Sequence, residues 1–260
     1  MEGVALARTA RIKTEAALYH LTLRGNGRQL LFEDDDDRKL FLGLVKTRIQ
    51  AASVSVIAWC LMDNHVHLLV SDPSDHLADA MRSLGTSYAQ HFNEKHGHVG
   101  HVFQGRYGSK PVLDERHLLE AVRYIHANPA EAGMGAAESY CWSSYAEYAH
   151  AERASNHLCD TKLVLELLGS PRGFIEFSEQ VPDIPYETIG AGRIPDEAMT
   201  AVAQRIAETF GLPSIRDVSS QSKDRRNKVL NAMRNARLSV RQIERLTGIG
   251  RATVYRVTSK

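Results

Sequence analysis

The sequence predicts an α+β fold, in which a ferredoxin-like antiparallel sheet with helices on one face precedes an all-helical C-terminal domain. Strand-like and helical patterns alternate in the order β-α-β-β-α-β over residues 1–150, and a further helix follows. Residues 151–210 read as a helical connector. Residues 211–260 are expected to form an all-helical domain, with three helices from Lys223 onwards and the spacing of a helix-turn-helix at the end.

The first four elements lie within residues 17–71. "ALYHLTLRG" alternates apolar and polar side chains and ends at a Gly-Asn-Gly turn. An amphipathic helix is predicted after Asp34–Asp37, whose carboxylates suit the positive end of a helix dipole; a metal site at this acidic run is the alternative. "SVSVIAWCLM" and "HVHLLVS" then read as two strands, with Asp63 and Asn64 as the hairpin turn between them.

The remaining elements follow in order. "DHLADAMRSLGTSYAQHFNEKHG" has helical periodicity, and "GHVFQGRYGSKPVL" reads as an extended, basic strand. "DERHLLEAVRYIHANP" predicts a helix that starts at Asp114 and ends before Pro129. Two helices are expected in the connector, separated by a linker rich in Pro and Gly at 181–195.

Composition narrows the class of protein. The chain has 260 residues and is 43% hydrophobic, enough for one full core and a smaller second domain. Its three cysteines form no CxxC pair, which is typical of a reduced protein without a cysteine zinc site. No signal-peptide segment and no apolar run of membrane-spanning length is present. We therefore expect a soluble, cytoplasmic protein with no membrane partner.

Two histidines stand one residue apart in the strand "HVHLLVS". Side chains two apart in a strand face the same side, so His65 and His67 project together. Two adjacent imidazoles can each give one nitrogen to a divalent cation, which predicts a metal site. Ordinary sheet histidines are the alternative. Because two ligands are too few for a stable site, a third is expected from elsewhere in the chain.

"RYIHANP" contains a tyrosine and an asparagine at helical spacing. A helix places Tyr124 and Asn128 on one face, about one turn apart. Asn128 could then supply an amide oxygen to a hard cation beside the Tyr124 ring. The spacing alone leaves another interpretation equally open, in which Tyr124 is a core residue and Asn128 caps the helix before Pro129.

Residues 17–150 resemble the single-tyrosine HUH transposases, and most of all their REP-associated branch. The segments that carry the resemblance are "YHLTLRGNGRQLLF", "CLMDNHVHLLV", "HFNEKHGHVGHVFQGRY", "YIHANPAEAGM" and "WSSY", in that order. "NHVHLLV" matches the His-hydrophobic-His signature, and "YIHANP" is where that family carries its tyrosine nucleophile. Histidine-triad hydrolases have a third alternating histidine, where this chain has Leu69.

The resemblance implies a metal-dependent enzyme that nicks and rejoins single-stranded DNA, at hairpin sequences in the REP-associated branch. Tyr124 would attack a backbone phosphorus and form a 5′-phosphotyrosine, which conserves the reactivity of the phosphodiester. His65, His67 and Asn128 would hold Mg²⁺ or Mn²⁺, and the cation would polarise the scissile phosphate. Relatives occur as dimers and as monomers, so a homodimer is an open expectation.

Basic residues near the predicted site are candidate DNA contacts. Arg106 and Lys110 are expected to bind backbone phosphates. Tyr107, between them, is a competing nucleophile, but it has no polar partner at helical spacing and is interpreted as a base-stacking or sheet residue. Arg123, next to Tyr124, is a candidate for neutralising the scissile phosphate; an exposed helix arginine is the alternative.

The last 38 residues carry eleven basic and two acidic side chains, a net charge of +9 against +1 for the whole chain. This charge suits phosphate contact. "LSVRQIERLTGIGRATVYRV" resembles the helix-turn-helix of DnaA-type or recombinase-type modules, with Ser239 as the cap of its first helix and Gly248 in its turn. We expect this domain to bind duplex DNA through side chains on and around the second helix: Arg241, Arg245, Arg251, Thr253, Tyr255 and Arg256.

Two other functions remain open. One is a DNA-binding regulator that keeps the fold and does no chemistry, although a decayed enzyme would be expected to lose part of the His65, His67, Tyr124 and Asn128 set. The other is a metal-dependent nuclease that hydrolyses DNA with water and forms no covalent intermediate.

Overall fold

The structure is a computed structural model that describes residues 16–152, 157–180, 186, 199–236 and 238–258. The chain divides into two compact units, Met1–Gln180 and Val181–Lys260. This division differs from the expected boundaries, because the helices of the predicted connector belong partly to the first unit and partly to the second. The predicted linker at 181–195 lies outside the described residues, apart from Tyr186. The described helices include none that is both long and apolar enough to cross a membrane.

The first unit is built on a four-stranded antiparallel sheet with the order β2-β3-β1-β4. The strands are β1 (Leu18–Arg24), β2 (Ser55–Leu61), β3 (His65–Ser71) and β4 (Gly108–Val112). With helices between and after the strands, the elements follow the predicted β-α-β-β-α-β order and end with the further helix. The α+β fold is therefore confirmed.

One face of the sheet packs against α1 (Asp35–Leu44), the single turns η2 (Val45–Ile49) and η3 (Gln50–Ala52), and α2 (Leu77–His96). Alternate residues of the strands turn to this face and form the main hydrophobic core with both helices. That core includes Leu21, Leu23, Val66, Leu68, Val70, Phe41, Leu84 and Tyr88. The packing therefore fixes which strand residues face the other side.

The acidic run before α1 is a helix cap. Asp34 accepts a hydrogen bond from the Asp37 backbone N–H at 3.0 Å. The buried Asp37 carboxylate binds Lys95 at 2.8 Å and His96 at 2.9 Å, both at the end of α2. Lys95 Nζ also binds Asp34 at 2.7 Å, so the run links α1 to α2 through a lysine.

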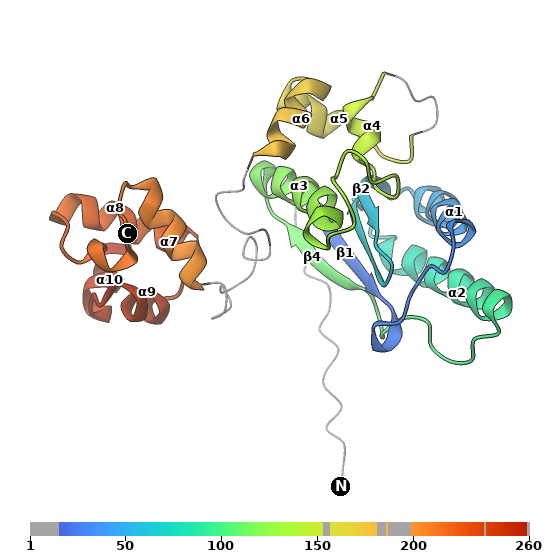
Figure 1. Ribbon diagram of the computed structural model, residues 1–260, viewed down its shortest axis with the longest axis horizontal. Coiled ribbons are helices and arrows are strands. Elements are labelled where there is room, and N and C mark those ends of the chain that lie inside the picture. The colour runs from blue at the N-terminus through green and yellow to red at the C-terminus, as the bar shows by residue number, and fades with distance from the viewer. Residues whose placement is uncertain (1–15, 153–156, 181–185, 187–198, 237, 259–260) are drawn as a thin grey trace, which may run out of the picture. The chain divides into compact units, whose positions relative to one another are not determined.

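Helix α3 (Glu115–Glu131) lies on the opposite face of the sheet from α1 and α2 (Figure 1), so the helices are not all on one face as expected. Asp114 caps its start by accepting from the His117 N–H at 2.7 Å. The prediction that the helix ends before Pro129 is wrong, because Pro129 lies inside it. The missing proline N–H does not end the helix, since the Ala132 N–H still bonds the Asn128 carbonyl at 3.0 Å.

The chain after α3 covers the outer edge of β2 and then packs on α3. Residues 142–144 run along β2, where the Leu61 N–H bonds the Trp142 carbonyl and the Ser144 N–H bonds the Trp59 carbonyl, each at 2.9 Å. The short helices α4 (Tyr145–Ala149), α5 (Lys162–Leu168) and α6 (Pro171–Glu179) follow. Contacts of α6 with α3 and α4 hold this group on the first unit.

The second unit is all-helical in its described part. It contains α7 (Met199–Thr209), the turn η5 (Ile215–Val218), α8 (Lys223–Asn235), α9 (Val240–Thr247) and α10 (Arg251–Thr258) around one apolar core. Ser239 caps α9 in a reciprocal pair with Gln242, and Gly248 ends the helix with φ 72°. Helix α10 begins three residues later and packs on α8 and α9.

Candidate active site

The two strand histidines project together, as predicted. His65 and His67 alternate with Val66 and Leu68, which point into the core on the other face. The His65 and His67 ring centroids are 5.0 Å apart, with the ring planes nearly perpendicular. His67 is buried and His65 is half-buried, so the pair lies at the margin between the sheet and solvent.

Strand β1 adds a third histidine that the sequence analysis did not single out. His20 Nε2 lies 2.8 Å from His67 Nδ1, and the two rings stack with centroids 5.0 Å apart. His20 reaches this place because Thr22 is directly opposite His67, and His20 is on the same face two residues away. The alternation in "YHLTLRG" gives the face of His20, but only the pairing of β1 with β3 gives its neighbour.

Helix α3 brings the predicted tyrosine to the same face. The half-buried Tyr124 ring has its centroid 5.6 Å from that of His67 and 5.9 Å from that of His20, edge-on to both. The competing Tyr107 instead packs against the hydrophobic core under α1 and α2. Of the two tyrosines, Tyr124 is thus the one whose ring contacts the imidazoles.

Asn128 joins the tyrosine to the histidines. Its side-chain NH₂ donates to the Tyr124 backbone carbonyl at 2.7 Å, one turn earlier in α3. Its side chain also lies close enough to His65 and His67 to raise the pKa of both rings, against the larger opposing effect of burial. Asn128 is therefore not the C-cap of α3, and its side chain lies beside both rings.

Burial keeps the imidazoles neutral. It is the largest cause that lowers the pKa of His67 well below its usual value, and the neighbouring His20, His65 and Arg24 add to the effect. Burial, Lys110 and His117 lower the pKa of His20 to about 3. The pKa of His65 is lowered by burial and by Arg24, against smaller opposing effects of Asn128 and Asp63. Neutral rings have a nitrogen lone pair available for a metal.

The donor atoms fit a divalent cation. The two neutral imidazoles are neighbours, and the Asn128 side chain interacts with both, so two ring nitrogens and one amide oxygen are grouped on this face of the sheet. This mixed nitrogen and oxygen set suits Mn²⁺ and accepts Mg²⁺ when phosphate oxygens complete the coordination. In the described part of the chain, no group of three or more His, Cys, Asp or Glu side chains could hold a metal, so the amide is needed as the third ligand.

The other residues predicted to lie near the site differ in position and exposure. Lys110 is opposite His20 in the β1–β4 register and is exposed, so it lies on the site face of the sheet. Arg106 is exposed in the loop before β4. The interpretation of Arg123 as a phosphate contact is contradicted, because its side chain is buried against Phe177 and pairs with Glu120 at 2.5 Å. Arg123 also donates to the Phe177 and Gln180 carbonyls, each at 3.2 Å.

The residues predicted to bind DNA in the second unit lie largely at its surface. Thr253 is half-buried, and the exposed ones are Arg241, Arg245, Arg251, Tyr255 and Arg256. Arg251 is tied to Glu244 of α9 by an ion pair at 2.5 Å. The Arg245 guanidinium lies 2.9 Å from the Met199 sulfur. The surface of α9 and α10 is therefore basic, with some of its arginines held by neighbours.

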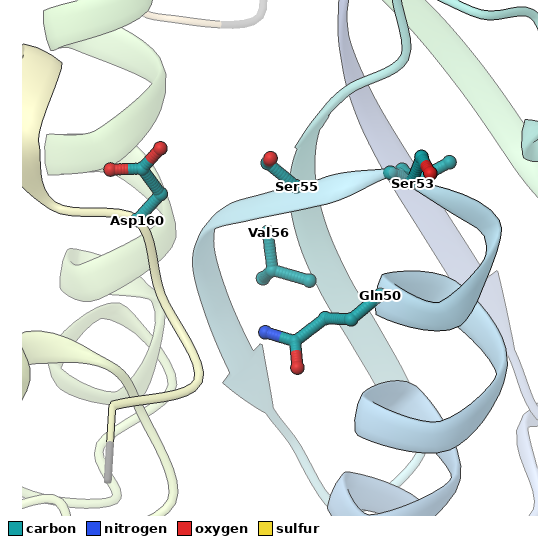
Figure 2. A pocket seen from close by; sticks show the side chains of 6 residues that line it. Gln50, Ser53, Ser55, Val56 and Asp160 are labelled. Atoms are coloured by element: carbon teal, nitrogen blue, oxygen red, sulfur yellow. The ribbon is translucent and has the colours of Figure 1, made fainter.

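A separate hollow lies at the far end of β2 and has a volume of about 360 Å³. Figure 2 shows Asp160 on one side of it and Gln50, Ser53 and Ser55 on the other. Ser55 pairs with Ser71, whereas His67 pairs with Cys60 towards the other end of the strand. None of the residues around the two histidines lines this hollow.

The geometry of the first unit defines a class of protein: an α+β domain with a histidine pair on the sheet and a tyrosine delivered by a helix. Residues 13–128 match the model of the family described as "Transposase IS200 like". The match covers less than half of the chain, and this part is similar to the IS200-like transposases.

Solved structures and curated proteins complete the comparison. A REP-associated tyrosine transposase bound to a REP hairpin is 13% identical, with a TM-score of 0.48 over 61% of this chain and 96% of that chain. A candidate transposase from Deinococcus radiodurans R1 is 19% identical, with a TM-score of 0.33 over 50% of this chain and 98% of that chain. No curated protein matches the sequence.

Proposed function

We propose that the first unit cleaves and rejoins single-stranded DNA through a covalent tyrosine intermediate. The observation that supports this function is the arrangement around Asn128, which faces His65 and His67 while it bonds the Tyr124 backbone. One helical turn thus links the nucleophile to the residues that would hold a cation.

In the proposed reaction, the Tyr124 phenol oxygen attacks a backbone phosphorus. A bond forms between the phenol oxygen and phosphorus as the bond from phosphorus to the 3′ oxygen breaks, the phenol loses its proton, and the 3′ oxygen gains one. A later 3′-hydroxyl can reverse the step without an added energy source, because the phosphotyrosine remains a phosphodiester. A free tyrosine has a pKa near 10, so the site must favour its attack on the phosphate.

The residues of the chain divide the work. His65, His67 and Asn128 would hold Mg²⁺ or Mn²⁺, and the bound cation would polarise the phosphate and stabilise charge on its oxygens. His20 holds the His67 ring in place through its 2.8 Å contact. Lys110 is exposed on the site face and Arg106 is exposed in the loop before β4, and both would bind phosphates that flank the site.

The proposed substrate is hairpin-forming single-stranded DNA, as the likeness of the sequence segments to the REP-associated branch suggests. The second unit is proposed to bind adjacent duplex DNA as a helix-turn-helix module, through the basic surface of α9 and α10. In this proposal the first unit binds single-stranded DNA and the second unit binds duplex DNA.

One gel tests the chemistry. The full chain is incubated with a labelled hairpin oligonucleotide and Mn²⁺, denatured and separated. We expect a labelled protein band in the wild type that is absent in Tyr124→Phe and retained in the matched control Tyr107→Phe. Cleavage that survives Tyr124→Phe would contradict the covalent mechanism and support a water-using nuclease. Binding without any cleavage would support a regulator.

A further inference from the structure

Arg24 is the last residue of β1 and lies on the site face of the sheet. In the β1–β3 register it is directly opposite His65, as Thr22 is opposite His67. Residues directly opposite in an antiparallel pair project to the same side, with Cβ atoms about 5 Å apart. The Arg24 side chain is exposed, so its guanidinium is at the solvent side of the histidine pair.

The charge of Arg24 lies beside the histidine pair, because Arg24 is directly opposite His65 and His67 is two residues further along the same face of β3. Asp63, two residues before His65, is itself bound to Arg38 at 2.7 Å. Among the described residues no carboxylate forms an ion pair with Arg24.

The backbone around Arg24 is held by two neighbouring segments. The Gln104 N–H bonds the Arg24 carbonyl at 2.8 Å, and the Gly25 N–H bonds the Asn64 carbonyl at 2.9 Å. Gly25 also packs closely against the next turn, where an added Cβ would lie 2.1 Å from the Gln29 carbonyl oxygen. The start of the Arg24 side chain is therefore fixed by the backbone, while the side chain is exposed.

We propose that Arg24 binds the DNA phosphate that lies against the histidine pair. This inference rests on the proposed function and names the positively charged side chain that would contact the substrate at the site. Arg24 takes the role that the sequence suggested for Arg123, which is buried and donates to the Phe177 carbonyl of α6. Arg24 instead is exposed, lies opposite His65, and forms no ion pair with a described carboxylate. A guanidinium can bind two phosphate oxygens at once, which suits a phosphodiester.

The test measures the salt dependence of DNA binding in the full chain. A fluorescein-labelled single-stranded oligonucleotide of mixed sequence is titrated with Tyr124→Phe protein in EDTA, and anisotropy gives the affinity at several salt concentrations. Adding Arg24→Ala is expected to lower the slope of log K against log salt by about 0.7, the value for one phosphate contact on a single strand. Arg48→Ala is the matched control, because Arg48 is an exposed arginine of η2, on the α1 side of the sheet.

Each result decides the proposal. Equal slopes for Arg24→Ala and Arg48→Ala would overturn it. Arg24→Lys keeps the charge and is expected to keep the slope; a fall like that of the alanine variant would show that the charge does not bind phosphate. Circular dichroism and melting temperature check that each variant folds. Failure of the proposed function can be told apart from failure of this inference. In that case the salt slope would still depend on Arg24, but the gel would show no covalent adduct between protein and DNA.

Discussion

His20 Nε2 lies 2.8 Å from His67 Nδ1. A neutral imidazole has one donor and one acceptor nitrogen, so this contact requires complementary tautomers in the two rings. When His67 donates from Nδ1, its Nε2 carries a lone pair and is available as a ligand. His20 is thus placed to decide which nitrogen of His67 can bind a cation.

The first prediction concerns this contact. Replacing the orienting partner of a ligand histidine typically weakens metal binding by about 10- to 100-fold. We expect His20→Ala to weaken Mn²⁺ binding by a factor in this range, and His20→Gln, which keeps a polar partner, to weaken it less. Isothermal titration with Mn²⁺ in the absence of DNA measures the affinity directly.

The control for His20 is His150→Ala, which removes an exposed histidine at the end of α4. Its Mn²⁺ affinity should equal that of the wild type. A folded His20→Ala protein that binds Mn²⁺ as tightly as the wild type would rule out the orienting role.

Arg123 is expected to matter for stability. Its guanidinium pairs with Glu120 and donates to two carbonyls at the end of α6. Removing one partner of a buried ion pair typically costs about 3–5 kcal/mol, because the other charge is left uncompensated. We therefore predict that Arg123→Ala lowers the free energy of unfolding of the first unit by this order, measured by urea denaturation.

The exposed pair Arg82 and Asp79 of α2 supplies the comparison, since both side chains are largely solvated. Arg82→Ala should change the free energy of unfolding by less than about 1 kcal/mol. If Arg123→Ala unfolds like Arg82→Ala but loses affinity for single-stranded DNA, the sequence-based interpretation of Arg123 was right after all.

Local pattern was enough to predict the faces of the site. The period of a strand placed His65 and His67 together, and the period of a helix placed Tyr124 and Asn128 together, because both depend only on neighbours in the chain. The family resemblance then joined the two pairs. The Ser239 cap and the Gly248 helix end were also predictable, since capping is a local property.

What the sequence could not supply depends on pairing between distant segments. His20 meets His67 through a strand register that alternation alone does not fix. Arg123 is buried by a helix that follows it by about fifty residues in the chain, and nothing near Arg123 signals that contact. Pro129 is a local signal for the end of a helix, but α3 continues past it because the Ala132 N–H still bonds the Asn128 carbonyl.

The free energy of unfolding of the metal-free protein should begin to fall below about pH 6.5, at a higher pH than that at which carboxylates titrate. His126 is fully buried among Tyr145, Tyr148 and Phe174, and burial lowers its pKa from 6.5 to about 3. Below pH 6.5, His126 is therefore protonated in the unfolded chain but remains neutral in the folded chain until the pH approaches 3. Stability is present above pH 6.5 and is lost as pH falls towards 3, by about 1.4 kcal/mol per pH unit for this histidine.

His126→Gln tests this window. Glutamine does not titrate and can keep a hydrogen bond to the Ser144 hydroxyl, which lies 2.7 Å from His126 Nε2. Between pH 7 and pH 5, the loss of unfolding free energy measured by urea denaturation should be about 2 kcal/mol smaller in His126→Gln than in the wild type, because the histidine of the unfolded chain is only partly protonated near pH 6.5. The same loss in both proteins would mean that His126 can protonate without unfolding the chain.

The last prediction concerns duplex binding by the second unit. Arg256 is exposed on α10, whereas the neighbouring Arg251 is held by Glu244. If this surface contacts a duplex, each phosphate contact contributes about 0.9 to the slope of log K against log salt, so Arg256→Ala should lower the slope by that amount. Anisotropy with a labelled duplex measures it, with Arg172→Ala on α6 as the control, an exposed arginine paired with Glu176. An unchanged slope in Arg256→Ala, together with a fall in Arg172→Ala, would move the duplex contact from the second unit to the first.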